Sequence, residues 1–176
     1  MHRTFAFAVL LIAIVAGAGC ATGRDVPYQP SPDEVVRGML DMAKVGPGDF
    51  VIDLGSGDGR IPIEAARRGA RALGIEIDPA LVGEAQANAR AAGVEDRVQF
   101  RQQDLFEADL SQASVITLYL FPQVNLKLRP RLQALKPGTR IVSHNWDMGD
   151  WKPDRQEMIF GKRVYLWVIP ERGQAK

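Results

Sequence analysis

Cysteine is almost absent from this sequence, since Cys20 is the only one among its 176 residues. An intramolecular disulfide is therefore excluded, and so is a cysteine nucleophile anywhere after the N-terminal region. An excess of charge of one sign is missing as well, because 22 basic and 21 acidic residues give a formal net charge of +1. This balance offers no electrostatic case for a specific nucleic-acid partner, and we predict neither such a partner nor a metal site.

Long hydrophobic runs are also scarce, and the clearest apolar run follows Arg3 at the N-terminus. It covers residues 5–15, too short for a comfortable membrane span, and small residues follow it up to Cys20. This order predicts a signal peptide over residues 1–20 and a location in the bacterial cell envelope. The letters AGC before the predicted domain resemble a lipobox whose cysteine is lipidated, although Gly17 stands where Leu or Val is usual. Cleavage after Ala18 and an uncleaved N-terminal anchor stay open as alternatives.

The remaining chain has the length of one domain with a single buried core. Residues 21–32 are rich in proline and indicate a linker, residues 33–170 form the predicted domain, and residues 171–176 form a tail. Ser31 is expected to cap the first helix, with Pro32 in its first turn and Glu34 completing a capping box. Apolar residues at helical spacing continue this helix to Ala43.

Strand and helix patterns then alternate along the chain. Strands are expected at 50–54, 72–77, 97–101, 114–120 and 139–143, with helices at 61–68, 79–93 and 123–135. Pro130 should kink the last helix or mark its true start. Two further strands, 156–160 and 163–169, flank Gly161-Lys162 and predict a hairpin. The pattern predicts an α/β fold with a mostly parallel central sheet, a C-terminal antiparallel hairpin and helices on both faces.

The stretch VIDLGSGDGR, residues 51–60, joins the first strand to the following helix. Such a loop presents backbone N–H groups and the positive end of a helix, and its glycines let a ligand approach the backbone. Glu76 ends the second strand, where an acid can accept hydrogen bonds from ribose hydroxyls. Asp104 follows the third strand and could accept one from an adenine amino group. These strand ends share one edge of a parallel sheet, so the sequence predicts a site for an adenosine-containing cofactor there.

The glycine spacing separates two classes of cofactor. Dinucleotides favour G-x-G-x-x-G, with the pyrophosphate on the helix N-terminus, whereas Gly55, Gly57 and Gly59 follow G-x-G-x-G. Asp53 precedes them, and a carboxylate there suits a cationic amine better than a pyrophosphate. S-adenosylmethionine carries such an amine and a sulfonium. We therefore favour S-adenosylmethionine over a nicotinamide cofactor.

The motifs DLGSGDGR, GIEID and QQDLF resemble the successive motifs of class I S-adenosylmethionine-dependent methyltransferases, and the similarity runs from about residue 28 to residue 168. The region from PSPDEVV to RIPIEAA is similar to the protein-lysine methyltransferases of the ATP synthase c-subunit type, and more distantly to the non-SET histone lysine methyltransferases. The region from LYLFPQV to NWDMGDWKPD looks closer to small exported bacterial methyltransferase-like proteins. The resemblance implies a Rossmann-like class I fold and methylation of a protein lysine or another amine.

The resemblance also implies a role for each matching cofactor residue. Asp53 would hold the methionine amine through water, Gly55, Ser56 and Gly57 would approach the methionine and ribose, and Glu76 would bind the ribose hydroxyls. Ile77 would pack on the adenine, with Asp104 and Leu105 completing that part of the site. For Asp104 a helix cap stays open as the alternative.

The acceptor side must lie beside the transferred methyl group, because the protein mainly positions the acceptor. Our catalytic candidates are Tyr119, after the fourth strand, and His144 and Asn145, after the fifth. His144 is expected to point into the crevice, with a structural role as the alternative. Trp146 is a further acceptor-side candidate, and both it and Trp151 could instead form a hydrophobic lid. Tyr28 could fold back over the cofactor.

Several acceptor classes can be separated from the sequence. Methylation of cytosine C5 needs a cysteine nucleophile and is excluded. The segment TLYLFP lacks the Asn/Asp-Pro-Pro-aromatic signature of enzymes that methylate amino groups of DNA. A protein amine is the favoured acceptor and a small molecule stays open. An exported protein that keeps the cofactor fold but only binds a ligand is the alternative from another class.

Overall fold

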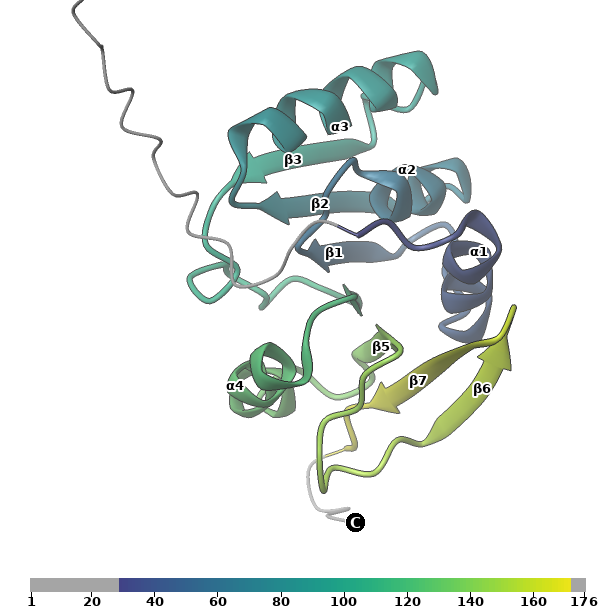
Figure 1. Cartoon of the computed structure of the whole chain (residues 1–176), viewed down its shortest axis with the longest axis vertical. Coiled ribbons are helices and arrows are strands. Elements are labelled where there is room, and N and C mark those ends of the chain that lie inside the picture. The colour runs from purple at the N-terminus through teal and green to yellow at the C-terminus, as the bar shows by residue number, and fades with distance from the viewer. Residues whose placement is uncertain (1–28, 172–176) are drawn as a thin grey trace, which may run out of the picture.

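The computed structural model describes residues 29–171 (Figure 1). The predicted leader at 1–20, most of the linker and Tyr28 lie outside the described residues. The elements, in chain order, are α1 (Asp33–Met42), β1 (Phe50–Leu54), α2 (Arg60–Arg67), β2 (Arg71–Glu76), α3 (Pro79–Ala91), β3 (Val98–Gln102), β4 (Val115–Leu118), α4 (Pro122–Gln133), β5 (Arg140–His144), β6 (Arg155–Ile159) and β7 (Lys162–Val168).

The seven strands form one sheet in the order β3-β2-β1-β4-β5-β7-β6. Strands β1 to β5 are parallel, and β7 pairs antiparallel with both β5 and β6. The predicted α/β fold with a C-terminal antiparallel hairpin is confirmed. The chain builds outward from β1 to β3 and then returns to place β4 on the other side of β1. Ligands of parallel sheets bind at such a switch point, outside the carboxyl ends of the strands.

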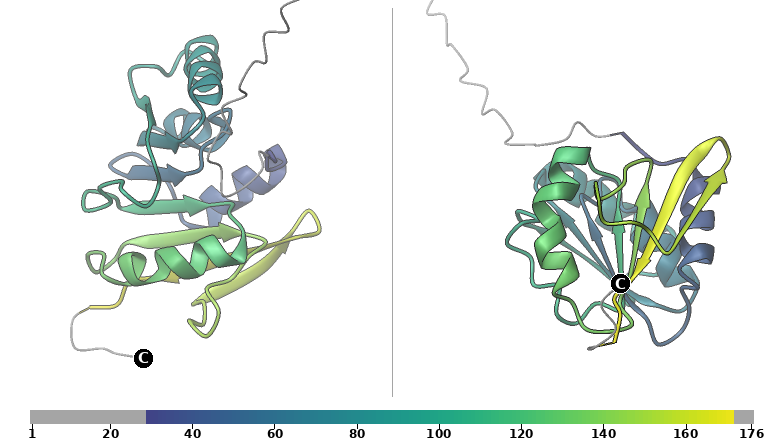
Figure 2. Two further views of the ribbon diagram at one scale, coloured as in Figure 1. Left: turned by 60° about the vertical axis from the view of Figure 1, so that its left-hand side comes forward. Right: turned by 90° about the horizontal axis from the view of Figure 1, so that it is seen from below.

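Helices cover both faces of the sheet. Figure 1 and Figure 2 show α1, α2 and α3 on one face and α4 on the other. Alternation along β1 divides the core, because Val51 packs under α1 and α2 while Ile52 packs with Leu128 of α4. No helix within residues 29–171 has the length and apolar character needed to cross a membrane.

The hairpin turns one residue earlier than the sequence indicated. Phe160 and Gly161 connect β6 to β7 with φ values of 47° and 72°. Positive φ at both central positions is the pattern of a type I′ turn. The hairpin packs on α1 through Ile159, which lies so close to Gly38 that a Cβ there would stand 2.7 Å from its side chain.

The start of α1 corrects the predicted capping box. Pro32 is the N-cap residue and no side chain caps the helix. The hydroxyl of Ser31 instead shares a 2.8 Å hydrogen bond with Nδ1 of His144. A sequence pattern could not reveal this competing partner, because it lies 113 positions along the chain.

Helix α4 begins at Pro122 and continues through Pro130 to Gln133. Pro130 is therefore not the start of this helix. Pro130 removes one backbone hydrogen bond, because it has no N–H to donate to the carbonyl of Leu126, and the helix ends within one turn after it, at Gln133.

Candidate functional site

A cavity opens at the carboxyl edge of the sheet, above β1, β2 and β4. All eight residues predicted to hold the cofactor line this one cavity, together with Tyr119; the eight are Asp53, Gly55, Ser56, Gly57, Glu76, Ile77, Asp104 and Leu105. They come from three loops far apart in the sequence, and the parallel sheet brings them together at the switch point.

Asp53 is the most deeply buried charged group in this set, with 2% of its surface exposed. The register pairs it with Thr117 of β4, whose hydroxyl donates a 2.6 Å hydrogen bond to its Oδ1. Burial raises the pKa of Asp53 to about 7, the bond from Thr117 opposes this, and the charges of Glu76 and Asp58 add to the rise. A nearby cation would stabilise the ionised form of this carboxyl group.

The glycine loop leaves β1 directly after Leu54. The backbone N–H groups of Gly55 and Ser56 both donate to the carbonyl of Ile75, at 2.9 Å. Gly55 has φ of 80°, and a Cβ there would lie 2.9 Å from the Leu120 side chain. The backbone conformation therefore favours glycine at this position, and a side chain there would also displace the tip of Leu120.

Glu76 is held at the end of β2 by three backbone donors. Its Oε2 accepts from the N–H of Gly57 at 3.0 Å, and its Oε1 accepts from Ile77 at 2.8 Å and Asp78 at 3.0 Å. These bonds fix the carboxylate between the glycine loop and the start of α3. Ile77 beside it is 38% exposed and offers the cavity an apolar surface.

Asp104 follows β3, and its Oδ1 accepts a 2.8 Å hydrogen bond from the N–H of Phe106. It therefore stabilises a turn, whereas the alternative interpretation of this residue was a helix cap. Leu105 next to it is half-buried. Both residues line the cavity, and their contact with an adenine stays a prediction.

The acceptor-side candidates separate into two groups. Tyr119 lines the cavity, whereas His144 and Asn145 do not. The His144 ring is fully buried behind Tyr119 and stacks on it, with centroids 3.9 Å apart. The strand register explains this stacking, because β4 and β5 are paired up to the residues that directly precede these two rings. The expectation that His144 points into the crevice is corrected accordingly.

Burial, and to a smaller extent the positive charge of Lys162, lower the pKa of His144 to about 4. The imidazole is therefore neutral at physiological pH. Its Nε2 is buried and has no hydrogen-bond partner among the described residues. A neutral ring behind the cavity wall is suited to holding its neighbours in place and cannot store a proton near pH 7.

The other candidates after β5 lie away from the cavity lining. Asn145 has φ of 65°, a left-handed conformation that asparagine tolerates, and follows the end of the strand. Trp146 is 38% exposed. Trp151 tilts against Trp167 at 5.6 Å between ring centroids, in the core on the α4 side of the sheet. Trp151 is accordingly a packing residue there.

Sequence reasoning missed several residues of the site. The cavity is also lined by Ser31, Arg60, Gln103 and Leu120. Gln103 and Leu120 adjoin predicted residues, and Arg60 ends the glycine motif, so their positions carried a usable signal. Thr117 could be found only once β4 was known to lie beside β1.

The cavity fits S-adenosylmethionine in polarity. Asp53 offers a carboxylate for an amine, and Ile77 and Leu105 offer apolar surface for a base. The hydroxyl of Ser56 is buried against β2, 2.6 Å from where a Cβ on Gly74 would stand, and it has no hydrogen-bond partner among residues 29–171.

Comparisons with known proteins agree with this geometry. A family model of the ANTKMT methyltransferase domain matches residues 53–155. A protein-lysine N-methyltransferase of Saccharolobus islandicus is 44% identical over 83% of this chain and 95% of its own. The Xenopus laevis lysine N-methyltransferase of the ATP synthase c-subunit is 34% identical over 79% of this chain, which spans 60% of that protein. The crystal structure of an RNA methyltransferase from Salinibacter ruber with S-adenosyl-L-homocysteine is 57% identical and has a TM-score of 0.80, covering 84% of this chain and 98% of that one.

Proposed function

The chain belongs to the ANTKMT methyltransferase family, and from that premise we propose that it transfers methyl groups from S-adenosylmethionine to lysine side chains of a protein. The similarity to the archaeal protein-lysine N-methyltransferase carries the lysine assignment, because it extends over nearly the whole of both chains. The cavity at the switch point supports the cofactor assignment.

Different residues of the cavity are suited to binding different parts of the cofactor. When bound, S-adenosylmethionine supplies a methyl group that its sulfonium has already activated. Asp53 would bind the amine, directly or through water, and Glu76 would accept hydrogen bonds from the ribose. Ile77 and Leu105 would pack on the base, and Asp104 would accept a hydrogen bond at its edge, since all of these residues line the cavity.

The acceptor lysine must be neutral to attack the methyl group. His144 is not its base, because its ring lies behind Tyr119 and a pKa lowered to about 4 makes it a weak proton acceptor at neutral pH. Tyr119 forms an aromatic wall for the amine, and desolvation there lowers the pKa of the lysine. The proton then leaves to solvent before transfer, and catalysis consists mainly of positioning.

A direct test uses the purified protein with S-adenosylmethionine carrying a radiolabelled methyl group and a cell-envelope protein extract. We expect label in protein, recovered as methyl-lysine by mass spectrometry, and none with the matched Asp53→Ala and Glu76→Ala variants. Binding of the cofactor without transfer to any acceptor would favour the non-catalytic binding protein over this proposal.

RNA is a second candidate acceptor, favoured by the 57% identity to a protein described as an RNA methyltransferase. The net charge of +1 gives it no electrostatic support. The same assay run with total RNA separates the two. Label in nuclease-sensitive material and none in protein would replace the lysine assignment.

We also propose that the N-terminal leader places the enzyme in the cell envelope, with Cys20 as the lipidated residue. The support is the order of charge, apolar residues and small residues before Cys20. Fractionation of cells expressing the full chain tests this. Wild type is expected with membranes and Cys20→Ala in a soluble fraction; equal distribution of both would contradict lipidation.

A further inference from the structure

Residues 29–31, which we call the strap, run along the cavity just before α1. Gln29, Pro30 and Ser31 all contribute to its lining, although none of them belongs to the glycine loop or the strand ends. Ser31 is 2% exposed, whereas Gln29 and Pro30 are exposed. Ser31 is therefore the residue that fixes the strap to the cavity wall.

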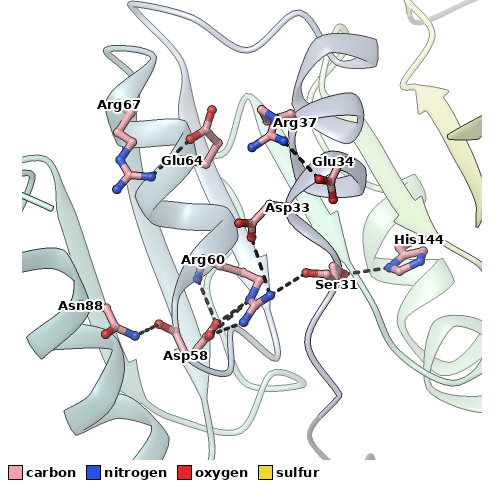
Figure 3. A network of polar contacts seen from close by, with 10 residues as sticks. All are labelled: Ser31, Asp33, Glu34, Arg37, Asp58, Arg60, Glu64, Arg67, Asn88 and His144. Atoms are coloured by element: carbon pink, nitrogen blue, oxygen red, sulfur yellow. Dashed lines mark hydrogen bonds and ion pairs between the residues drawn. The ribbon is translucent and has the colours of Figure 1, made fainter. Parts of the chain in front are cut away.

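Arg60 ties the strap to the glycine loop. Its Nη1 donates a 2.8 Å hydrogen bond to the carbonyl of Ser31, while its Nη2 and Nε bind the carboxylate of Asp58 at 2.6 and 3.0 Å. The carbonyl of Asp58 in turn accepts from Asn88 of α3, at 3.0 Å. Figure 3 shows this row of contacts from α3 to the strap.

His144 holds the same residue from the other side. Its Nδ1 shares the 2.8 Å hydrogen bond with the Ser31 hydroxyl, and its ring supports Tyr119 by stacking. Figure 3 shows Ser31 between Arg60 and His144. One serine therefore joins the glycine loop to the end of β5 and to the aromatic wall.

We propose that Ser31 is a positioning residue whose bonds to Arg60 and His144 fix the strap and Tyr119 as a wall shared by the cofactor and the acceptor. This inference deepens the proposed function and rests on it. Ser31 itself lines the cavity. His144 does not line it and would affect ligand binding only through its contacts with Ser31 and Tyr119. Loss of the hydroxyl bond should loosen the wall without removing any group that binds the cofactor directly.

The test compares variants of the full chain that separate the bond from the ring stack. Ser31→Ala removes the hydroxyl and leaves His144, while His144→Phe keeps a ring for Tyr119 and removes Nδ1. Each is expected to weaken S-adenosylhomocysteine binding and to lower kcat/KM for the acceptor by about fivefold, since one hydrogen bond contributes on the order of 1 kcal/mol. Ser31→Thr keeps the hydroxyl and should retain most of both. Ser111→Ala, at an exposed serine outside the cavity lining, is the matched control.

The double variant Ser31→Ala/His144→Phe distinguishes a shared bond from two separate effects. We expect it to lose no more than the larger single loss. Losses that add, or unchanged binding and kcat/KM in Ser31→Ala, would overturn the proposal. So would a loss that merely follows the folded fraction measured by circular dichroism.

The affinity for S-adenosylhomocysteine does not depend on the acceptor. If the wild type binds it but methylates no protein, the proposed function fails while the strap is still tested. If the wild type methylates protein and Ser31→Ala is unaffected in both readouts, only the positioning role fails.

Discussion

Ionising Asp53 in the ligand-free protein is costly, because its carboxyl group is almost wholly enclosed and two further carboxylates lie nearby. The hydrogen bond from Thr117 offsets only part of this cost. A cationic ligand would supply the missing countercharge. The residue is therefore poorly suited to stabilising the empty fold and well suited to binding an amine.

The first prediction concerns stability without ligand. Native Asp53 binds its proton with a pKa of about 7, against 3.8 for the ordinary value. Between these pH values the native state holds more protons than the unfolded state, so this group lowers stability as pH rises. Asp53→Asn should raise the free energy of unfolding at pH 8 by about 2–4 kcal/mol and change it little near pH 4. Urea denaturation at both pH values measures this; an equal effect at both would contradict it.

The second prediction concerns affinity. Because Asp53 binds the cofactor amine in its ionised form, affinity for S-adenosylhomocysteine should rise roughly tenfold between pH 6 and pH 8. Asp53→Asn should bind weakly and show no such rise. Calorimetry across this range gives the answer, and a wild-type affinity independent of pH would remove Asp53 from the amine site.

The strand-end pattern, which places Asp53, Glu76 and Asp104 at one edge of a parallel sheet, and the family resemblance together indicated eight residues that line the cavity. His144 was misjudged for a reason at the same scale. Its side depends on the register of β5 against its neighbours, which places it toward α1 and behind Tyr119. Alternation of apolar and polar residues shows which side chains of a strand share a face. It does not show which distant helix or segment covers that face.

At the scale of elements, the start of α2 depends on Gly59. This N-cap residue has φ of 83°, and a Cβ there would stand 2.6 Å from the Phe100 ring and 2.9 Å from the Ala85 side chain. Gly59→Ala should therefore lower the free energy of unfolding by about 3 kcal/mol, through backbone strain and overpacking together. Gly93→Ala is the matched control, since its φ is 66° and nothing lies within 4 Å. We expect a loss of about 1 kcal/mol there from backbone strain alone, and equal losses in urea denaturation would refute the steric argument.

A substitution in the hairpin turn is expected to stabilise the protein. Phe160 is 74% exposed and has φ of 47° in the turn between β6 and β7. Asparagine tolerates this conformation and Asn-Gly favours a type I′ turn, so Phe160→Asn should stabilise the protein by about 0.5–1 kcal/mol. Phe160→Val, with a β-branched side chain, should destabilise it. Thermal unfolding of both variants would show whether the backbone conformation of the turn determines the change in stability.

Element boundaries were predictable where local chemistry sets them. Asp78 caps α3, accepting from the N–H of Ala80, and Pro79 is the first residue of the helix, in agreement with the predicted range 79–93. The start of α1 was not predictable in detail, because Ser31 has a partner in β5. A capping motif shows that a serine hydroxyl can bond to a nearby backbone N–H of the helix. In the folded protein the same hydroxyl can bond to a residue distant in sequence instead.

At the scale of the whole molecule, ligand binding should stabilise the folded state by mass action. S-adenosylhomocysteine at a hundred times its Kd contributes about 2.7 kcal/mol. The Tm should then rise by roughly 5–10 °C. NAD at the same concentration should leave it unchanged, because the loop lacks dinucleotide spacing. A shift with NAD alone would overturn the choice of cofactor.

The sheet order could be expected only in part. Repeated βα units predict parallel neighbours, and the sequence indicated the final hairpin. The insertion of β7 between β5 and β6 was not deducible, because either hairpin strand could have paired with β5. Tyr165 and Trp167 of β7 pack into the core on the α4 side, and this burial selects β7 as the inner strand.

The antiparallel course of β7 also separates the two ends of the described chain. Ser31 contacts the last residue of β5, while Ile169 accepts from Gly138 just before its first residue (Figure 2). The polypeptide enters beside the mouth of the cavity and leaves at the opposite rim of the sheet. An affinity handle or a surface linkage added after residue 171 would thus hold the enzyme with its mouth facing outward. A fusion ahead of the strap would place its cargo at the entrance used by the substrate.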